Sequence, residues 1–314
     1  MMNEFEIINK YLSPLSIKNK GSYNLKNDIF YDYKKKLAVS VDTYIEKKHF
    51  LNFTNPLLVI KKIFRSALSD LICKGITPKY YFISSSGNKK SFSKKKLSLI
   101  MRALRSEQKK YNVTLVGGDT TKSNVLSFTF IMIGYSENPP KKRNNVKNND
   151  DIYVTGNLGD SFVGLSILKK KIKCNKKDKA YFVKSYYLPI LHTKFSKSVK
   201  FLANSSIDIS DGLFQDLKHL FYKNKFTHNI DSSKIPISNK LKLLLNKKKM
   251  NKMNLISKGD DYQILFTCRS KYRKHIMKLS KKCSTKVTRI GIVKSLNSKT
   301  LTNSDKNIGY IHKF

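Results

Sequence analysis

The chain has 314 residues, more than one hydrophobic core usually holds, so two domains are expected. No apolar run approaches the roughly 18 residues that a membrane-spanning helix needs. Two glutamates precede the first basic residue and no apolar stretch follows, so no secretion signal is expected. The four cysteines lie far apart, which indicates a reducing, cytoplasmic location without disulfides or a zinc site.

The net charge is +42, from 63 Lys and Arg against 21 Asp and Glu. One interpretation is a protein that binds nucleic acid or an anionic membrane. The alternative is a composition biased toward lysine, with the lysines in solvated positions. Two features favour the alternative: most of the charge is Lys, whereas bidentate phosphate recognition prefers Arg, and the lysines are spread along the chain. We therefore expect neither a membrane partner nor a nucleic-acid partner.

The N-terminal half alternates strand and helix patterns. Residues 36–45 alternate apolar and polar side chains, as a half-buried strand does. Pro56 opens a helix that runs to about residue 74, and Asp70 lies at the border of its apolar stripe. The elements expected next are a strand at 80–85, a helix at 94–110, and strands at 113–116 and 126–135. This alternation predicts the α/β (α+β) fold class.

The polar stretch at residues 137–150, with its Pro-Pro pair, is typical of a linker. It divides the chain into domains at residues 1–138 and 139–314. The elements expected in the second domain are strands at 151–155, 206–209, 262–267 and 286–293, helices at 160–168, 195–203, 212–222 and 271–281, and a lysine-rich loop at 169–179. Both halves contain strand and helix material of similar size, which suggests two related halves.

The few acids of this basic chain stand in informative places. Hard cations such as Mg²⁺ take oxygen ligands, and phosphoryl transfer needs little more than such ions, a phosphate cradle and positioning. Taken singly, each aspartate is explained as a helix cap or a turn former. Their shared context, rich in Gly, Ser or Thr at strand ends and helix starts, favours a joint metal site. These acids are Asp28, Asp42, Asp70, Asp119, Asp208, Asp211, Asp260 and Asp261.

Three motifs carry most of these acids. Residues 116–121 follow a predicted strand, and their paired glycines allow a backbone to approach phosphate beside Asp119, although an ordinary turn is the alternative. In residues 207–213, Ser210 or Asp211 is expected to cap a helix. Two carboxylates three residues apart there would repel phosphate unless cations intervened, which favours metal. Residues 258–262 show the same design before another strand, again with a turn as the alternative.

No familiar ATP or hydrolase motif accompanies these acids. The sequence has no HExxH, no Walker A loop, no GxSxG and no protein-kinase signature, so any ATP site is not a Walker A cradle. His49 lies just beyond the first strand, where a surface or packed histidine is the ordinary alternative to a functional one.

Eight segments follow one another in order along nearly the whole chain: residues 3–8, 40–50, 68–75, 116–121, 153–160, 208–213, 260–262 and 309–314. Taken together, they resemble the thiamine-monophosphate kinase family, of the aminoimidazole-ribonucleotide-synthetase-like superfamily. From the second segment on, the family patterns are S-T-D-T…H-F, N-L-S-D-L…M-G, G-G-D-T-T, Y-V-T-G-x-x-G-D, I-D-x-S-D-G-L, G-E-D-Y and G-Y-x-H-F. The chain departs from the family at Lys26-Asn27-Asp28-Ile29 for G-D-D-A, at Val41 for threonine, at Lys258 for glycine and at Asp260 for glutamate.

The resemblance implies phosphorylation of thiamine monophosphate to thiamine diphosphate, by direct in-line transfer from the co-substrate ATP with several Mg²⁺ ions. No general base is assigned, because the acceptor phosphate is already ionised. The metal residues implied are Asp28, Ser40, Asp42, Asp70, Asp119, Asp208 and Asp211. The ATP contacts implied are Gly118, Arg143, Ser210 and Tyr111. The contacts implied for thiamine monophosphate are His49, Asp260 and Tyr310.

The resemblance also implies a two-domain architecture with the active site in the cleft between the domains. The N-terminal domain, of a sheet plus helices, would bind ATP and metal and pair with that of a second chain into a homodimer barrel. The C-terminal α/β domain would complete the cleft. One alternative is another ATP-using enzyme of the superfamily, although a selenophosphate synthetase would carry a reactive cysteine near its N-terminus, and the first cysteine here is Cys73 within a predicted helix. The other is an inactive scaffold that binds nucleic acid.

Overall fold

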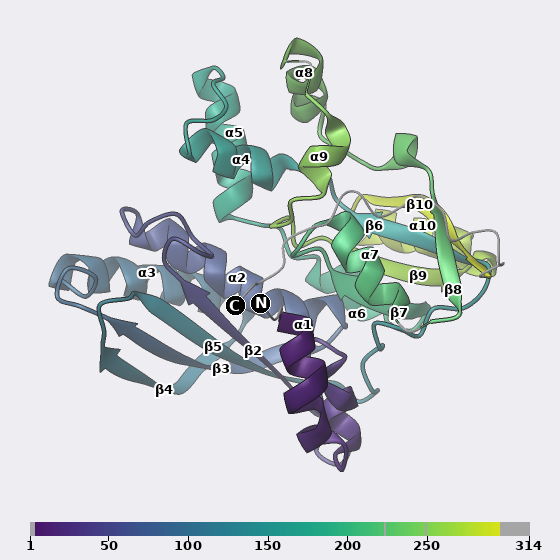
Figure 1. Cartoon of the computed structure of the whole chain (residues 1–314), viewed down its shortest axis with the longest axis horizontal. Helices are drawn as coiled ribbons and strands as arrows, with labels where there is room; N and C mark the ends of the chain where they lie inside the picture. The colour runs from purple at the N-terminus through teal and green to yellow at the C-terminus, as the bar shows by residue number, and fades with distance from the viewer. Residues whose placement is uncertain (1–3, 223, 249, 296–314) are drawn as a thin grey trace.

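The computed structural model describes residues 4–222, 224–248 and 250–295. Its strands form two five-stranded sheets, one from each half of the chain (Figure 1). The first sheet has the order β1-β2-β5-β3-β4, in which β3 and β4 are parallel and the other neighbours antiparallel. Its strands are β1 (Phe30–Asp32), β2 (Leu37–Ile45), β3 (Thr77–Gly87), β4 (Thr114–Lys122) and β5 (Ser127–Tyr135).

Helix α2 (Pro56–Cys73) lies between the two halves of the molecule. The Asn55 side chain caps it by accepting from the backbone N–H of Leu58 at 3.2 Å, and Pro56 follows as the first helical residue. The helix packs on β2 and β5 on one side and on β7 (Ala203–Asp208) of the second sheet on the other. This double contact explains why most of its side chains are buried. Helix α3 (Lys94–Tyr111) packs beside it.

The first sheet has an apolar face that no helix of the described residues covers. Figure 1 shows α2 and α3 on one side of this sheet only. Strand register places Val41, Ile131 and Phe82 in one row across the other face, with Val39 and Ile133 in the next. These side chains are half-buried or exposed. We call this surface the open face.

The second sheet is antiparallel throughout, in the order β7-β9-β6-β10-β8. Its other strands are β6 (Asp150–Thr155), β8 (Phe226–Ile230), β9 (Ile264–Arg269) and β10 (Val287–Ser295). Helix α7 (Leu213–Phe221) packs its apolar face on this sheet with Leu213, Leu217 and Leu220. The remaining helices of this half are α4 (Asp160–Leu168), α5 (Lys176–Tyr187), α6 (Thr193–Val199), α8 (Asn239–Lys248), α9 (Lys252–Ile256) and α10 (Arg273–Lys282).

A short helical N-terminal segment lies against the cleft between the halves. It begins with α1 (Glu4–Ile7) and continues as a π-helical stretch, Ile8–Leu12. Two 3₁₀ turns follow, Ser13–Ser16 and Lys20–Leu25, and lead the chain to β1. Phe5 contacts His219 of α7, with ring centroids 4.9 Å apart.

The predicted α/β fold class and most predicted elements are confirmed, with two kinds of correction. Residues 116–121 were expected to follow a strand that ends near residue 116, but they lie within β4, because β3 pairs with this strand as far as Lys122. Helices α1, α5, α8 and α9 and strands β1 and β8 were not predicted, and α5 begins within the expected loop. Residues 136–149 contain no helix or strand, so the sheets lie on either side of the boundary proposed at residue 138. Within the described ranges, no helix is long and apolar enough to cross a membrane.

Candidate active site

Two adjoining cavities lie where the halves of the molecule meet. The smaller one has a volume of about 630 Å³ and lies among β2, α2, α4 and the loops at residues 208–211 and 258–262. We call it the acceptor cavity because two of the contacts predicted for the phosphate acceptor, His49 and Asp260, line it. The larger one, which we call the N-terminal cavity, has a volume of about 980 Å³ and is bounded by α1, residues 25–28 and α7. Asp42, Asp70 and Ser210 line both, so the two cavities form one continuous cleft.

Three of the predicted metal acids meet at the base of this cleft. Ligand oxygens of Asp28, Asp70 and Asp208 all lie within 4.8 Å of one another. They come from the loop before β1, the last turns of α2 and the end of β7, so both halves of the chain contribute. Among the described residues, no lysine or arginine forms an ion pair with Asp70 or Asp208. An all-oxygen site of this kind suits a hard divalent cation.

The electrostatics of the cleft acids agree with a cation site. Burial, reinforced by the neighbouring carboxylates, raises the pKa of Asp42 to about 6 and the pKa values of Asp208 and Asp211 to about 7. Burial and the charges of Asp42, Asp208 and Asp28 raise the pKa of Asp70 well above its usual range. The cluster therefore holds more negative charge than its surroundings compensate. Divalent ions would supply the missing positive charge.

Asp28 differs from the other acids because two cations flank it. Burial alone would raise the pKa of Asp28, but Arg143 and Lys74 together hold it below its usual range. The Lys74 ammonium lies 2.7 Å from Oδ2, and the Arg143 guanidinium donates to Oδ1. Arg143 belongs to the connection between the two sheets. The predicted nucleotide residue Arg143 and the predicted metal residue Asp28 are thus direct neighbours.

Two glycine-containing loops pack backbone to backbone and present their acids to the cleft. Gly212 has φ of 112° and Gly259 has φ of 76°, values that favour glycine. A Cβ at Gly212 would lie 2.3 Å from the Ser257 carbonyl oxygen, and one at Gly259 would lie 2.1 Å from the Ser210 carbonyl oxygen. The backbone N–H of Asp260 donates to that same Ser210 oxygen at 2.8 Å. Both loops therefore need their glycines for this packing.

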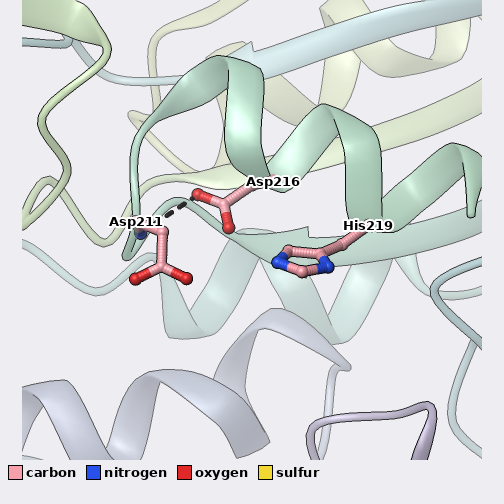
Figure 2. Close-up of side chains that lie close together, drawn as sticks. All are labelled: Asp211, Asp216 and His219. Carbon is pink, nitrogen blue, oxygen red and sulfur yellow. Dashed lines mark hydrogen bonds between the residues drawn. The ribbon is translucent and has the colours of Figure 1, made fainter. Parts of the chain in front are cut away.

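The cap of α7 differs from the sequence expectation. Neither Ser210 nor Asp211 caps the helix; the buried Asp216 carboxylate accepts from the backbone N–H groups of Asp211 at 3.3 Å and Gly212 at 3.2 Å. Figure 2 shows that the bond to Asp216 comes from the Asp211 backbone nitrogen, so the Asp211 carboxylate takes no part in it. Asp211 lines the acceptor cavity. An acid in the first turn of α7 was the signal for the capping role that the sequence analysis missed.

Asp211 and Asp216 form a second group of possible ligands with His219. One ligand atom from each lies within 4.8 Å of the others (Figure 2). Burial raises the pKa of Asp216 well above its usual range, with Asp211 and Asp208 adding to the effect. Burial and the positive charge of Arg143 lower the pKa of His219 to about 4. His219 is therefore neutral near pH 7.

Two of the predicted acceptor contacts line the acceptor cavity. His49 accepts from the backbone N–H of Ile45 through Nδ1 at 2.9 Å, and this bond orients its ring. Asp260 accepts from the Lys62 ammonium at 2.6 Å and from the Tyr262 hydroxyl at 3.1 Å. Lys62 is almost fully buried and lies 4.4 Å from the centroid of the Tyr186 ring. The sequence analysis missed Lys62, because only the tertiary contact between α2 and the loop at residues 258–262 reveals it.

The acceptor cavity is lined by basic as well as acidic side chains. His49 and Lys62 line it together with three further lysines, Lys48, Lys169 and Lys258. Asp42, Asp70, Asp208 and Asp211 line the same cavity, and Asp42 and Asp70 also line the N-terminal cavity. A lining with both acids and bases suits a ligand whose anionic groups contact lysines as well as metal ions.

Three predicted residues of the first sheet do not line the cleft of this single chain. Ser40 is buried, and its hydroxyl lies 3.5 Å from the Ala67 carbonyl oxygen. Gly118 and Asp119 lie on the edge strand β4. Register aligns Asp119 with Thr43 across β3 and β5, so the Asp119 side chain lies on the open face, opposite to Asp42. Their assignment as ATP or metal residues stays a prediction.

Gly118 also has a structural role. A Cβ at this position would lie 1.8 Å from the Ile83 carbonyl oxygen, so the close pairing of β3 and β4 requires glycine. Tyr111, at the end of α3, places its ring centroid 5.9 Å from the Arg65 guanidinium and lines neither cavity. Tyr310 lies outside the described residues. The assignments of Tyr111 and Tyr310 are therefore untested.

The comparisons with known proteins agree with this geometry. The fold has two sheets with an acid-lined cleft between the halves, and residues 26–135 match the family model described as AIR synthase related protein, N-terminal domain. The chain is 36% identical over 307 residues to the thiamine-monophosphate kinase of Buchnera aphidicola subsp. Schizaphis graminum, covering 93% of this chain and 91% of that one. It is 32% identical to the Escherichia coli K12 enzyme of that name, covering 74% and 71%. The chain belongs to the thiamine-monophosphate kinase family.

A solved structure of this family extends the likeness to three dimensions. It is described as AaThiL complexed with AMPPCP and TMP, and it superposes with a TM-score of 0.85 at 26% identity. The match covers 99% of this chain and 97% of that chain. The folds therefore correspond over both halves.

Proposed function

We propose that this chain transfers the γ-phosphoryl group of ATP to thiamine monophosphate, in line and with Mg²⁺, and so forms thiamine diphosphate. The observation that carries the proposal is the gathering of Asp28, Asp42, Asp70, Asp208 and Asp211 around one cleft, in a chain of this family. The AaThiL complex with AMPPCP and TMP supports both ligands by similarity.

The acids divide into proposed roles by their surroundings. Asp42, Asp70, Asp208 and Asp211 have raised pKa values, and among the described residues none has an ion-pair partner, so we assign them to Mg²⁺. Bound Mg²⁺ supplies positive charge to the phosphate oxygens of the nucleotide. Ser210, at the junction of the two cavities, is assigned to the nucleotide. Arg143, which lines the N-terminal cavity, is placed to contact the same ligand.

The acceptor is proposed to bind beside the basic residues of the acceptor cavity. The His49 ring, which is oriented by its bond to Ile45 and lines the cavity, is assigned to the acceptor phosphate. Asp260, held by Lys62, is assigned to the thiamine part. A phosphate acceptor is ionised at neutral pH, so no side chain has to remove a proton in the transfer.

We further propose a homodimer formed through the open face. Val39, Val41, Phe82, Ile131 and Ile133 present there an apolar surface of the kind that a second copy can cover. Asp119 lies on that face, so pairing of two chains would remove it from solvent and bring it near residues of the other copy. This arrangement supports keeping Gly118 and Asp119 among the proposed nucleotide and metal residues.

A product assay tests the reaction. Purified protein with ATP, Mg²⁺ and thiamine monophosphate is expected to form thiamine diphosphate, identified by chromatography with fluorescence detection after oxidation, and to form none when Mg²⁺ is replaced by EDTA. A panel of other small phosphate acceptors serves as the specificity control. Turnover of a panel member with none of thiamine monophosphate would assign the chain to another reaction of the superfamily.

A further inference from the structure

Lys74 is a buried cation inside the acid cluster. It follows the last residue of α2, and its side chain is 0% exposed. Its ammonium donates to the carbonyl oxygen of Ser206 in β7 and lies 2.7 Å from Asp28 Oδ2. Burying an ammonium is unfavourable unless an acid compensates its charge. The acids of the cluster therefore stabilise the Lys74 side chain in this buried position.

Asp28 contacts a cation at each of its oxygens. Oδ1 accepts a hydrogen bond from Arg143, whereas Oδ2 lies 2.7 Å from the Lys74 ammonium as an ion pair and, within the described residues, has no partner in hydrogen-bonding geometry. Asp70 and Asp208 complete the same cluster, yet no ion pair reaches either of them within the described residues. Positive charge from the protein is therefore concentrated at one of the three carboxylates.

We propose that the Lys74 ammonium is a resident cation of this cluster, which occupies the place that a divalent ion would otherwise take at Asp28. In this chain Asp28 then orients Lys74 and Arg143 and binds no Mg²⁺, while Asp42, Asp70, Asp208 and Asp211 bind the ions. The inference rests on the Mg²⁺ binding of the proposed function and limits how many ions the cluster accepts.

Metal binding without substrates tests this directly. Mn²⁺ titration followed by electron paramagnetic resonance counts bound ions with neither ATP nor thiamine monophosphate present. Lys74→Met preserves the side-chain length and removes the charge. The variant is expected to bind roughly one more Mn²⁺ per chain than the unaltered protein, or to bind Mn²⁺ about tenfold more tightly. Equal number and equal affinity in the two proteins would overturn the proposal.

Lys200 provides the matched control. Its ammonium lies at the same domain interface, where it donates to the carbonyl oxygen of Gly75 at 3.4 Å and to the Ser136 hydroxyl at 3.2 Å, and it forms no ion pair among the described residues. Lys200→Met is expected to leave Mn²⁺ binding unchanged. A gain equal to that of Lys74→Met would show a general charge effect and would also overturn the proposal.

Asp28→Asn gives a second test. In the otherwise unaltered chain, where the result does not depend on the folding of Lys74→Met, it should leave the number of bound Mn²⁺ ions unchanged. In the Lys74→Met background it should abolish the gain. Loss of an ion in the unaltered background would show that Asp28 is a metal ligand beside Lys74. If neither the unaltered protein nor any variant binds Mn²⁺, the metal assignment of the proposed function is overturned as well. If Mn²⁺ binds but Lys74→Met does not change its binding, only this inference is overturned.

Discussion

Asp42 belongs to β2 and lines both cavities of the cleft, at the place where they join. The Tyr44 hydroxyl donates to it at 3.0 Å, so the side chain is oriented before any ligand arrives. Burial and the charge of Asp28 raise its pKa to about 6. A carboxylate held in this way binds a metal ion with little reorganisation.

Asp42→Asn is expected to lower the rate of thiamine diphosphate formation by about two orders of magnitude or more, because it removes one negative charge from the proposed metal site without changing its shape. Steady-state kinetics over a range of Mg²⁺ concentrations measures the effect. Asp231→Asn serves as the control, since Asp231 lies in an exposed turn with Lys234 as its partner. An unchanged rate in Asp42→Asn would remove this residue from the site.

The raised pKa values of Asp208 and Asp211 also couple metal binding to pH. Their folded-state pKa is about 7, against an unfolded value near the usual 3.8. Between about pH 4 and pH 7 the folded state therefore binds more protons, so the free energy of unfolding of the metal-free protein falls as pH rises through this window.

The increase in melting temperature that Mg²⁺ produces is therefore expected to be larger at about pH 8 than at about pH 5.5, because Mg²⁺ competes with protons for these carboxylates. Differential scanning fluorimetry with and without Mg²⁺ measures the difference. In Asp208→Asn/Asp211→Asn the dependence on pH should flatten. The same Mg²⁺ effect at both pH values would contradict the assignment.

Among the elements, α2 has the largest influence on the site. It supplies Asp70 to the metal cluster and Lys62 to the acceptor cavity, and Lys74, directly after its last residue, contacts Asp28. It also joins the halves through Arg65, whose guanidinium donates to Glu107 at 2.8 Å and to the Pro189 carbonyl oxygen at 3.1 Å. A change in the placement of this helix would therefore alter both cavities.

Lys62→Met is expected to raise the KM for thiamine monophosphate about tenfold while the KM for ATP changes little, because Asp260 loses the cation that positions it. Lys62→Arg should restore part of the loss. Lys61→Met is the matched control, since the adjacent Lys61 lies 3.9 Å from Glu107 and does not line the cleft. Equal increases in both KM values, without rescue by Arg, would indicate a general structural effect.

The elements also show what the sequence could predict. The helix at Pro56 and the one at residues 94–110 were found because proline, caps and apolar periodicity mark them locally. Helices α5 and α8 lie in lysine-rich stretches where this periodicity is weak, so they were missed. The Gly-Gly-Asp motif was expected to follow a strand, but tertiary pairing with β3 extended β4 through it.

At the scale of the whole molecule, the acids that meet in the cleft come from segments far apart in the sequence. Their residue types and contexts could be predicted, but their meeting depends on how α2 docks on β7 and how the loops at Gly212 and Gly259 interlock. For the same reason, Lys62, Lys74 and Asp216 escaped prediction. Each acquires its role from a contact with another element.

The homodimer proposal predicts the effect of a charge on the open face. Ile131→Lys places an ammonium at the centre of that face and is expected to yield monomers in sedimentation velocity, with an unchanged circular dichroism spectrum. The control is Leu243→Lys, because Leu243 is 70% exposed on α8, away from this sheet. If both variants sediment like the unaltered protein, the open face is not the interface.

The contact between Arg143 and Asp28 has a consequence for the segment that joins the sheets. Connections without helix or strand ordinarily tolerate insertions and deletions. Here residues 136–149 must bring a guanidinium to a buried carboxylate, so the spacing between Tyr135 and Arg143 is fixed by the site and not only by the distance between the sheets. Length variation among related chains should therefore be rarer before Arg143 than after it.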